Sequence, residues 1–237
     1  MKIDILTLFP EMLEAVLGAS IIGRAREKGL LEIAAHNIRD YTTDRHGRTD
    51  DYPYGGGRGM VMQCEPLYRC LTQVRGETRP HVVMMSAQGT TFTQDKAREL
   101  LTRGHVVLIC GHYEGIDRRF IDECVDEELS IGDFVLTGGE IAAATVADAV
   151  CRMVPGVLAE DVCFEDESHF SGVLEYPQYT RPEVWHDRPV PDILLSGHHA
   201  NIAKWRRQQS LLLTRERRPD LFAKLTLSRA DQKLLEE

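Results

Sequence analysis

The 237-residue sequence lacks long apolar runs and paired cysteines. No stretch approaches the roughly 18 uninterrupted apolar residues of a membrane span, and the amino-terminal residues 1–4 carry no signal-peptide pattern. The six cysteines are scattered, with neither a Cys-x-x-Cys pair nor histidines at zinc-finger spacing. These absences argue against a membrane protein and favour reduced, structural thiols, no metal site and a cytoplasmic location.

The common nucleotide-binding fingerprints are also missing. The most glycine-rich loop, Tyr-Gly-Gly-Gly-Arg-Gly-Met at 54–60, contains neither G-x-G-x-x-G nor G-x-x-x-x-G-K-[ST]. A nicotinamide-dependent oxidoreductase is therefore disfavoured. The loop is either a flexible connector or, because glycine leaves space beside Tyr54 and Arg58, a point of close approach to an RNA backbone or a flipped base.

Charge is unevenly distributed along the chain. The formal net charge of −9 argues against a globally basic nucleic-acid binder. Residues 176–237, however, carry 11 Lys and Arg against 8 Asp and Glu, a net of +3, whereas residues 1–175 carry 17 against 29, a net of −12. The carboxy-terminal part is the basic part of the chain.

Apolar runs and their punctuation predict an α/β protein with a parallel sheet. We expect strands at 3–9, 30–38, 81–86 and 105–110, because each is a short apolar run that ends in Pro, Gly or polar residues. Helices are expected at 11–17, 20–28, 93–103 and 140–152. The order strand, helix, strand between 81 and 110 is that of a parallel α/β unit. The polar, aperiodic stretch 39–51 predicts a long exposed loop.

The last third of the sequence has a different organisation. Residues 160–175 are acidic with little apolar content, which predicts a mobile linker. Proline-punctuated segments follow, and then a helix with Ile202, Trp205 and Leu212 on one face. Ser228-x-x-Asp231 resembles a capping box that opens a last helix. The predicted organisation is a domain of residues 1–159, a linker of 160–175 and a small helical domain of 176–237.

Glycine-rich loops follow two apolar runs between residues 105 and 140. The first reads Gly-His-Tyr-Glu-Gly-Ile-Asp at 111–117, and the second reads Ser-Ile-Gly-Asp-Phe-Val-Leu-Thr-Gly-Gly-Glu at 130–140. Ligands of open α/β sheets bind at the carboxyl ends of the strands, and glycines let bare N–H and C=O groups approach a ligand closely. One such glycine would serve a tight turn, but five in two adjacent loops favour a site for an adenine or a ribose.

These two loops resemble the methyl-donor loops of the bacterial tRNA (guanine-N1)-methyltransferase family, a knotted SPOUT class. The resemblance extends over almost the whole chain and includes Leu-Phe-Pro-Glu-Met at 8–12, Tyr-Gly-Gly-Gly at 54–57 and Pro-Gln-Tyr-Thr-Arg-Pro at 177–182. It implies a SPOUT-type parallel sheet flanked by helices, a deep trefoil knot near residues 85–140 and a small helical carboxy-terminal domain. The knot is implied by the resemblance alone, because true knots are nearly absent from folds.

The resemblance also implies an activity and its partners. The expected reaction moves a methyl group from S-adenosylmethionine to N1 of the guanosine immediately 3′ of the tRNA anticodon, position 37. The expected enzyme is a homodimer that binds tRNA but neither DNA nor a membrane, and a requirement for a divalent ion stays open. The alternative from another class is a non-catalytic RNA-binding module whose glycine loops track the RNA backbone.

Three groups of residues carry the roles that the resemblance implies. The target nucleotide would meet Asp50, Gly59 and Arg152. The S-adenosylmethionine pocket would be lined by Ser86, Ala87, Gln88, Gly89, Gly111, Tyr113, Glu114, Ile131, Gly132, Asp133, Phe134, Val135, Leu136, Gly138 and Gly139. Arg58 and Ala87 stand where the family usually has proline, which leaves the rigidity of these loops open, since proline fixes φ.

The catalytic group is expected in the acidic linker. A guanine N1 carries a proton, so a base must lie within hydrogen-bond reach as the methyl group moves. Where the family usually has an aspartate, this chain has Glu167, which we predict to be the general base, with the preceding Asp166 as the competing candidate. Arg152 is expected to stabilise negative charge on the guanine O6, or else to form a surface salt bridge with the linker.

Overall fold

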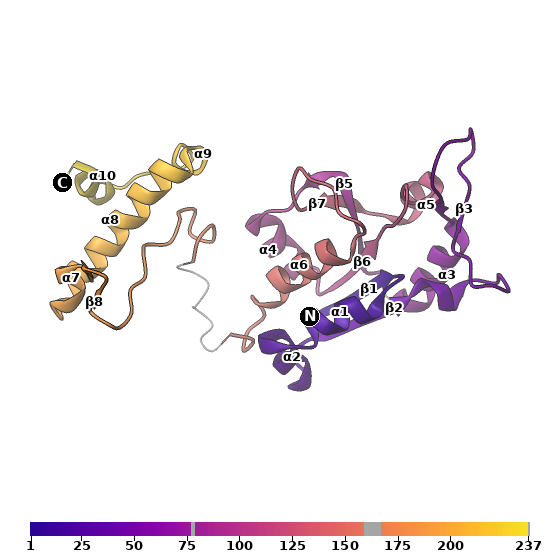
Figure 1. The fold of residues 1–237 in the computed structure, drawn as a ribbon, viewed down its shortest axis with the longest axis horizontal. Helices are drawn as coiled ribbons and strands as arrows, with labels where there is room; N and C mark the ends of the chain where they lie inside the picture. The colour runs from indigo at the N-terminus through magenta and orange to yellow at the C-terminus, as the bar shows by residue number, and fades with distance from the viewer. Residues whose placement is uncertain (77–78, 159–166, 237) are drawn as a thin grey trace. The chain divides into compact units, whose positions relative to one another are not determined.

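A computed structural model describes residues 1–76, 79–158 and 167–236, and the chain divides into two units, Met1–Asp161 and Val162–Glu237 (Figure 1). Within the described ranges, no helix is long and apolar enough to cross a membrane.

Five parallel strands form the sheet of the amino-terminal unit (Figure 1). Their order across the sheet is β2 (Glu32–Asn37), β1 (Lys2–Thr7), β6 (His105–Cys110), β5 (His81–Thr91) and β7 (Glu127–Ser130). Every neighbouring pair is parallel. The carboxyl ends of all five strands therefore lie along one edge, and the predicted α/β fold with a parallel sheet is confirmed.

Helices cover both faces of this sheet. They are α1 (Pro10–Leu17), α2 (Ser20–Glu27), α3 (Cys64–Arg75), α4 (Gln94–Thr102), α5 (Arg118–Cys124) and α6 (Glu140–Cys151). On one face, Leu67 and Leu71 of α3 and Phe120 of α5 are buried in one cluster with Val107 and Ile109 of β6. Helix α6 packs against β1 and β6 and also contacts α1 and α4. The expected helices at 11–17, 20–28, 93–103 and 140–152 are confirmed to within two residues at each end, whereas α3 and α5 were not predicted.

Two local expectations need correction. The stretch 39–51 is not simply a loop, because η1 (Ile38–Tyr41) occupies its start and β3 (Asp50–Asp51) its end, where β3 pairs with β4 (Val61–Met62). Strand β5 does not end at Ser86 but continues to Thr91, with an irregularity in its pairing to β7 between Met85 and Thr90.

Glycine at position 89 explains the extension of β5. A Cβ on Gly89 would lie 2.5 Å from backbone atoms of Glu128 and Leu129 in β7. Only a residue without a side chain lets the two backbones approach this closely. Gly89, which the sequence placed after the end of the strand, therefore allows β5 to continue alongside β7.

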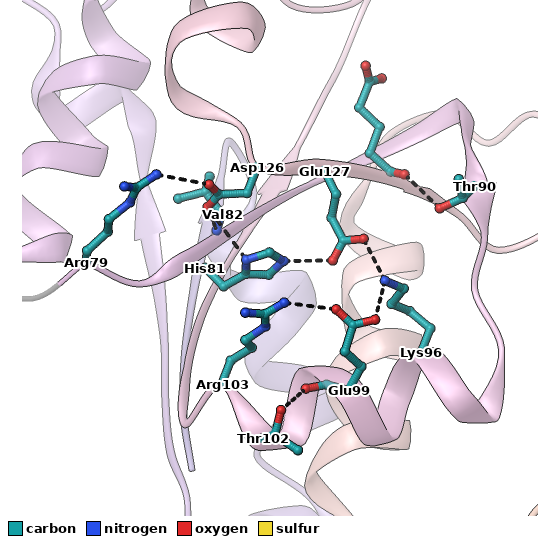
Figure 2. A network of polar contacts seen from close by, with 11 residues as sticks. Arg79, His81, Val82, Thr90, Lys96, Glu99, Thr102, Arg103, Asp126 and Glu127 are labelled. Carbon is teal, nitrogen blue, oxygen red and sulfur yellow. Dashed lines mark hydrogen bonds and ion pairs between the residues drawn. The ribbon is translucent and has the colours of Figure 1, made fainter.

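A network of charged side chains binds the edge strand β7 to α4 (Figure 2). The Nε2 atom of His81 lies 2.8 Å from a carboxylate oxygen of Glu127, and Lys96 Nζ lies 3.0 Å from the other. Lys96 also contacts Glu99 at 2.6 Å, and Arg103 contacts Glu99 at 3.0 Å. Because His81 and Glu127 begin their strands, this network lies at the amino ends of the strands, opposite the edge expected to hold a ligand, and charges on an edge strand oppose pairing with another chain.

The carboxy-terminal unit is built around the 19-residue helix α8 (His199–Arg217). Its other elements are β8 (Val184–Trp185), β9 (Arg188–Pro189), α7 (Asp192–Leu195), α9 (Pro219–Phe222) and α10 (Arg229–Glu236). The predicted capping box is confirmed: the Asp231 N–H donates to Ser228 Oγ at 3.1 Å, and the Ser228 N–H donates to Asp231 Oδ2 at 3.1 Å. The same carboxylate accepts from Arg207 Nε at 2.8 Å, which joins α10 to α8.

Of the predicted linker 160–175, residues 160–166 lie outside the described residues. The remainder is bonded to the carboxy-terminal unit. The Leu174 N–H donates to Thr214 Oγ1 on α8 at 2.8 Å, the Glu175 N–H donates to Ser168 Oγ at 2.9 Å, and Val173 is buried.

Candidate active site

A cavity of about 420 Å³ opens at the carboxyl ends of β6 and β7, beside the irregular part of β5. Its walls are residues 84–88 of β5, the loops that follow β6 and β7, and residues of α5 and of the start of α6 at Ala142. A volume in this range is typical of small-molecule sites, which span about 300–1,000 Å³. The cavity lies at the edge of the sheet where open α/β folds bind their ligands.

Most of the residues predicted to meet the methyl donor line this one cavity. They are Ser86, Ala87, Gln88, Gly111, Tyr113, Glu114, Ile131, Gly132, Phe134, Val135, Leu136, Gly138 and Gly139. Of the predicted set, Gly89 and Asp133 lie outside its lining: Gly89 packs on the backbone of β7, and Asp133 is exposed. Tyr113, Phe134 and Val135 are 51%, 55% and 86% exposed, so apolar surface is open to solvent around the cavity.

The two glycine loops are joined by a contact that tolerates no side chain. The Gly139 N–H donates to the Gly111 carbonyl at 3.0 Å, and a Cβ on Gly139 would lie 2.7 Å from the Cα of Cys110. At Gly111, in contrast, a Cβ would meet nothing closer than 3.8 Å. Gly139 is therefore required for the loops to approach each other, whereas a Cβ at Gly111 would make only ordinary van der Waals contact.

A buried polar cluster behind the cavity was not predicted from the sequence. Glu140, in the first turn of α6, is only 2% exposed, and its Oε1 accepts from Thr7 Oγ1 at 2.6 Å. Its two carboxylate oxygens lie 2.8 and 2.7 Å from Nε2 of His112, a residue that lines the cavity. We call Thr7, His112 and Glu140 the carboxylate cluster. It connects the end of β1, the loop after β6 and the start of α6.

The carboxylate cluster also affects the neighbouring thiol. Burial raises the pKa of the fully buried Cys110 well above its usual range, and the Glu140 carboxylate raises it further. Cys110 is therefore a protonated core residue. The other free cysteines in the described part of the chain are Cys64, Cys70, Cys124 and Cys151, and each has its pKa raised mainly by burial.

Two of the residues predicted to meet the target nucleotide belong to segments that are joined, directly or through the β3–β4 ladder, to the loop after β6. The Glu114 N–H donates to the Met60 carbonyl at 3.0 Å, and the Met62 N–H donates to the Gly115 carbonyl at 2.9 Å, so the segment after Gly59 is joined to the loop after β6. A Cβ on Gly59, which has φ +83°, would lie 2.4 Å from the Glu114 carboxylate. Asp50 pairs with Met62 in the short β3–β4 ladder.

Neither predicted catalytic residue is among those that line the cavity. Arg152 follows the last residue of α6 and its N–H donates to the Asp148 carbonyl at 3.0 Å. Since α6 has 12 residues, its far end lies roughly 18 Å from the end that borders the cavity. Glu167 belongs to the carboxy-terminal unit, where its carbonyl accepts from the Phe170 N–H at 3.3 Å, and Asp166 lies outside the described residues.

No group of three His, Cys, Asp or Glu residues among those described is arranged to hold a metal ion. The polar side chains at the cavity include Ser86, Gln88, His112, Glu114, Arg118 and Glu128, beside the backbone amides and carbonyls of its glycines. Fold and site together define an α/β protein with a cavity of small-molecule size at the carboxyl edge of a parallel sheet, bordered by two glycine-rich loops.

Comparison with known proteins identifies the family. The profile of the family described as tRNA (Guanine-1)-methyltransferase TrmD matches residues 1–224. The chain is 57% identical over 228 residues to the tRNA (guanine-N(1)-)-methyltransferase of Ruminiclostridium cellulolyticum, covering 95% of this chain and 97% of that protein. It is 52% identical over 237 residues to the enzyme of the same name from Clostridium acetobutylicum, covering 100% and 97%. The chain belongs to the tRNA (guanine-N1)-methyltransferase family, and the predicted resemblance is confirmed.

Proposed function

We propose that the protein transfers the methyl group of S-adenosylmethionine to N1 of the guanosine immediately 3′ of the tRNA anticodon, position 37, in the cytoplasm. The observation that carries the proposal is the cavity of about 420 Å³ at the carboxyl ends of β6 and β7. Membership in the tRNA (guanine-N1)-methyltransferase family supplies the class of reaction. We also propose that the segment near 85–140 forms the trefoil knot of the SPOUT class.

The residues at the cavity fit this methyl donor. Gly111, Gly138 and Gly139 present backbone without side chains, which suits the flat faces and polar edges of an adenosine. The apolar side chains of Leu136 and Ile131 line the same space and suit the ring faces. The Glu114 carboxylate offers an anion for the positively charged end of the donor. The donor supplies an electrophilic methyl group on a sulfonium leaving group.

The reaction requires one proton transfer on the side of the RNA. The N1 proton of the guanine passes to a base, the N1 lone pair forms the new bond to the methyl carbon, and the carbon–sulfur bond breaks as the sulfur takes its electron pair. We propose Glu167 as the base and Arg152 as the cation that stabilises negative charge on the guanine O6. Asp50 and Gly59 would hold the target nucleotide beside Glu114.

We further propose that the active site is shared between two copies of the chain. Within one copy, Arg152 lies at the end of α6 remote from the cavity, since the 12-residue helix spans roughly 18 Å. A second copy would bring its own Arg152 and Glu167 to the cavity. In this arrangement the donor cavity and the catalytic residues of a working site come from different subunits.

Methyl transfer to an unmodified tRNA transcript tests the proposed reaction. The protein is incubated with labelled methyl donor and transcript, and the methylated base is mapped. We expect label at N1 of guanosine 37. Label at another atom or nucleotide would refute the assignment. Tight binding of tRNA with neither methyl transfer nor donor binding would favour the alternative, a non-catalytic RNA-binding module.

Single-turnover assays test the base. General-base catalysis contributes about 10²–10⁴-fold, so we expect Glu167→Gln to slow the chemical step by that order with donor binding unchanged. Asp166→Asn is the matched control, because it removes a neighbouring carboxylate, and should cost far less. If the two variants exchange these effects, Asp166 is the base; if neither slows the step, the acidic segment is not catalytic.

Mixed dimers test the shared site. Gly111→Val should block the cavity and Glu167→Gln should remove the base, so each homodimer is expected to be inactive. A hybrid of the two variants would contain one site with both defects and one with none, and activity should return. If sedimentation shows that hybrid dimers form and they still lack activity, the cavity and the base of each working site come from the same subunit.

A further inference from the structure

The carboxy-terminal unit contains a second cavity, of about 410 Å³, that has no role in the proposed reaction. We call it the tyrosine cavity. It is bordered by residues 176–181, by Leu194 and Leu195 at the end of α7, and by Ile202 and Arg206 of α8. Its volume matches that of small-molecule sites, about 300–1,000 Å³, and its lining mixes apolar side chains with polar and charged ones.

Aromatic rings and a guanidinium group are already arranged around the tyrosine cavity. The guanidinium carbon of Arg206 lies 4.9 Å from the centroid of the Tyr176 ring, and the rings of Tyr179 and Trp205 lie 6.4 Å apart at 54°. Tyr179 is nevertheless 48% exposed. Tyr179 therefore offers a partly exposed ring to the same cavity that Arg206 borders. Unstacked nucleobases stack on aromatic rings and guanidinium planes in single-stranded RNA recognition, since every base has a face that can stack.

A rigid hairpin stands at the rim of the tyrosine cavity. Glu183 and Val190 line the cavity, and the Val190 N–H donates to the Glu183 carbonyl at 2.8 Å, which closes the hairpin at its base. At its tip, His186 and Asp187 have φ values of +47° and +60°, as a two-residue primed turn requires. Trp185 stacks on His186 with ring centroids 4.3 Å apart and stays 59% exposed. The hairpin thus presents a second stacking surface.

We propose that the tyrosine cavity binds one unpaired nucleotide of the tRNA, with its base stacked on Tyr179. Arg181 and Arg206 supply positive charge for a phosphate, and the Glu183 carboxylate supplies an acceptor for an exocyclic amine. The Glu183 carboxylate at the cavity does not suit the centre of a protein interface, where Glu is depleted. The net charge of +3 over residues 176–237 also favours RNA over a second copy of this acidic chain.

This inference rests on the proposed function in one respect, that tRNA is the substrate. It adds a contact beyond those proposed for the methylated guanosine, because no residue that lines the tyrosine cavity lines the donor cavity or belongs to the proposed set of Asp50, Gly59, Arg152 and Glu167. The nucleotide bound here is therefore held for affinity and register, and not for chemistry.

Replacement of Tyr179 in the full-length protein tests the site. Stacking of a base on an aromatic ring is worth about 1–3 kcal/mol, so Tyr179→Ala should weaken binding of an unmodified tRNA transcript by roughly 5- to 150-fold. Tyr179→Phe keeps the ring and should bind like the unchanged protein. Tyr68, 44% exposed on α3, is a matched control, and Tyr68→Ala should leave affinity unchanged. Turnover at saturating tRNA should be unaffected by Tyr179→Ala, since uniform binding alters KM alone.

Arg206 provides a second, independent measurement. If it meets a phosphate, Arg206→Gln should reduce the slope of log affinity against log salt by about 1. Unchanged tRNA affinity of Tyr179→Ala at every salt concentration would overturn the proposal, even where methyl transfer to guanosine 37 still succeeds. A change in oligomeric state on sedimentation, with tRNA affinity per dimer intact, would also overturn it and would assign the cavity to contact between copies.

Discussion

Conversion of Glu140 to Gln should destabilise the amino-terminal unit while leaving its shape almost unchanged. The buried carboxylate accepts from Thr7 Oγ1 at 2.6 Å and lies within 2.8 Å of His112 Nε2. A hydrogen bond to a charged group contributes about 1.5–3 kcal/mol and a neutral one about 0.5–1.5 kcal/mol, so two weakened bonds cost about 2–3 kcal/mol. Gln also directs an amide N–H toward one of the two donors, which adds to the cost.

Urea unfolding measures this loss. With a slope of about 2 kcal/mol per molar urea, the far-ultraviolet circular dichroism midpoint of the amino-terminal unit should fall by about 1 M. Both tryptophans, Trp185 and Trp205, belong to the carboxy-terminal unit. Tryptophan fluorescence therefore follows the other unit in the same sample, and its midpoint should stay where it is.

Glu11→Gln is the matched control. Glu11 also occupies the first turn of a helix, α1, but is exposed, so its replacement should lose only a helix-terminus interaction of about 0.3–1 kcal/mol. Because His112 lines the donor cavity, Glu140→Gln should also weaken binding of S-adenosylmethionine, whereas Glu11→Gln should not. Equal shifts of the urea midpoint in the two variants would refute the idea that the hydrogen bonds of the carboxylate cluster are the source of the stability that Glu140 contributes.

Two further predictions concern the other unit and the glycine loops. The Arg207 guanidinium lowers the pKa of Asp231 to about 2, so the pair stabilises the carboxy-terminal unit at any pH above about 4, the pKa of an aspartate in the unfolded chain. About 1–2 kcal/mol of that stability should be lost as the pH falls from about 4 to 2. Asp231→Asn should remove this pH dependence, which is measured by tryptophan fluorescence in urea at each pH. Gly139→Ala should destabilise the amino-terminal unit, because its Cβ would lie 2.7 Å from Cys110 Cα. Gly111→Val should retain the fold, because its Cβ would meet no atom closer than 3.8 Å, and should lose donor binding, because the side chain would enter the cavity. Urea midpoints and calorimetric titration with S-adenosylmethionine separate the two outcomes, and a Gly111→Val protein that binds the donor normally would contradict the proposed cavity.

Much of the local structure follows from the sequence. Short apolar runs that end at Pro, Gly or polar residues marked four of the five strands of the sheet, and Ser228 with Asp231 marked the start of the last helix. These signals are local, because a cap or a turn depends on side chains within a few residues of one another. The glycine loops at 111–117 and 130–140 marked the cavity that we propose for the donor, since parallel strands deliver their carboxyl ends to one edge.

The order of the strands and the carboxylate cluster depend on tertiary structure. Thr7, His112 and Glu140 meet only because β1 and β6 are neighbours and α6 begins at the same edge, and no local pattern pairs residues that lie 28 to 133 positions apart. Gly89 illustrates the same limit. From the sequence, Gly89 is expected to follow the end of a strand. In the structure, its missing side chain lets β7 approach closely, and β5 continues past it.

The position of the catalytic candidates was likewise decided by the fold. The sequence identified Arg152 through the family resemblance, but only the course of α6 places it away from the cavity of its own unit. A helix of 12 residues extends roughly 18 Å, farther than any side chain reaches. Sequence determined which residues are present and which turns they favour; the tertiary structure decided which of them meet, because contacts between distant segments depend on how the strands and helices pack.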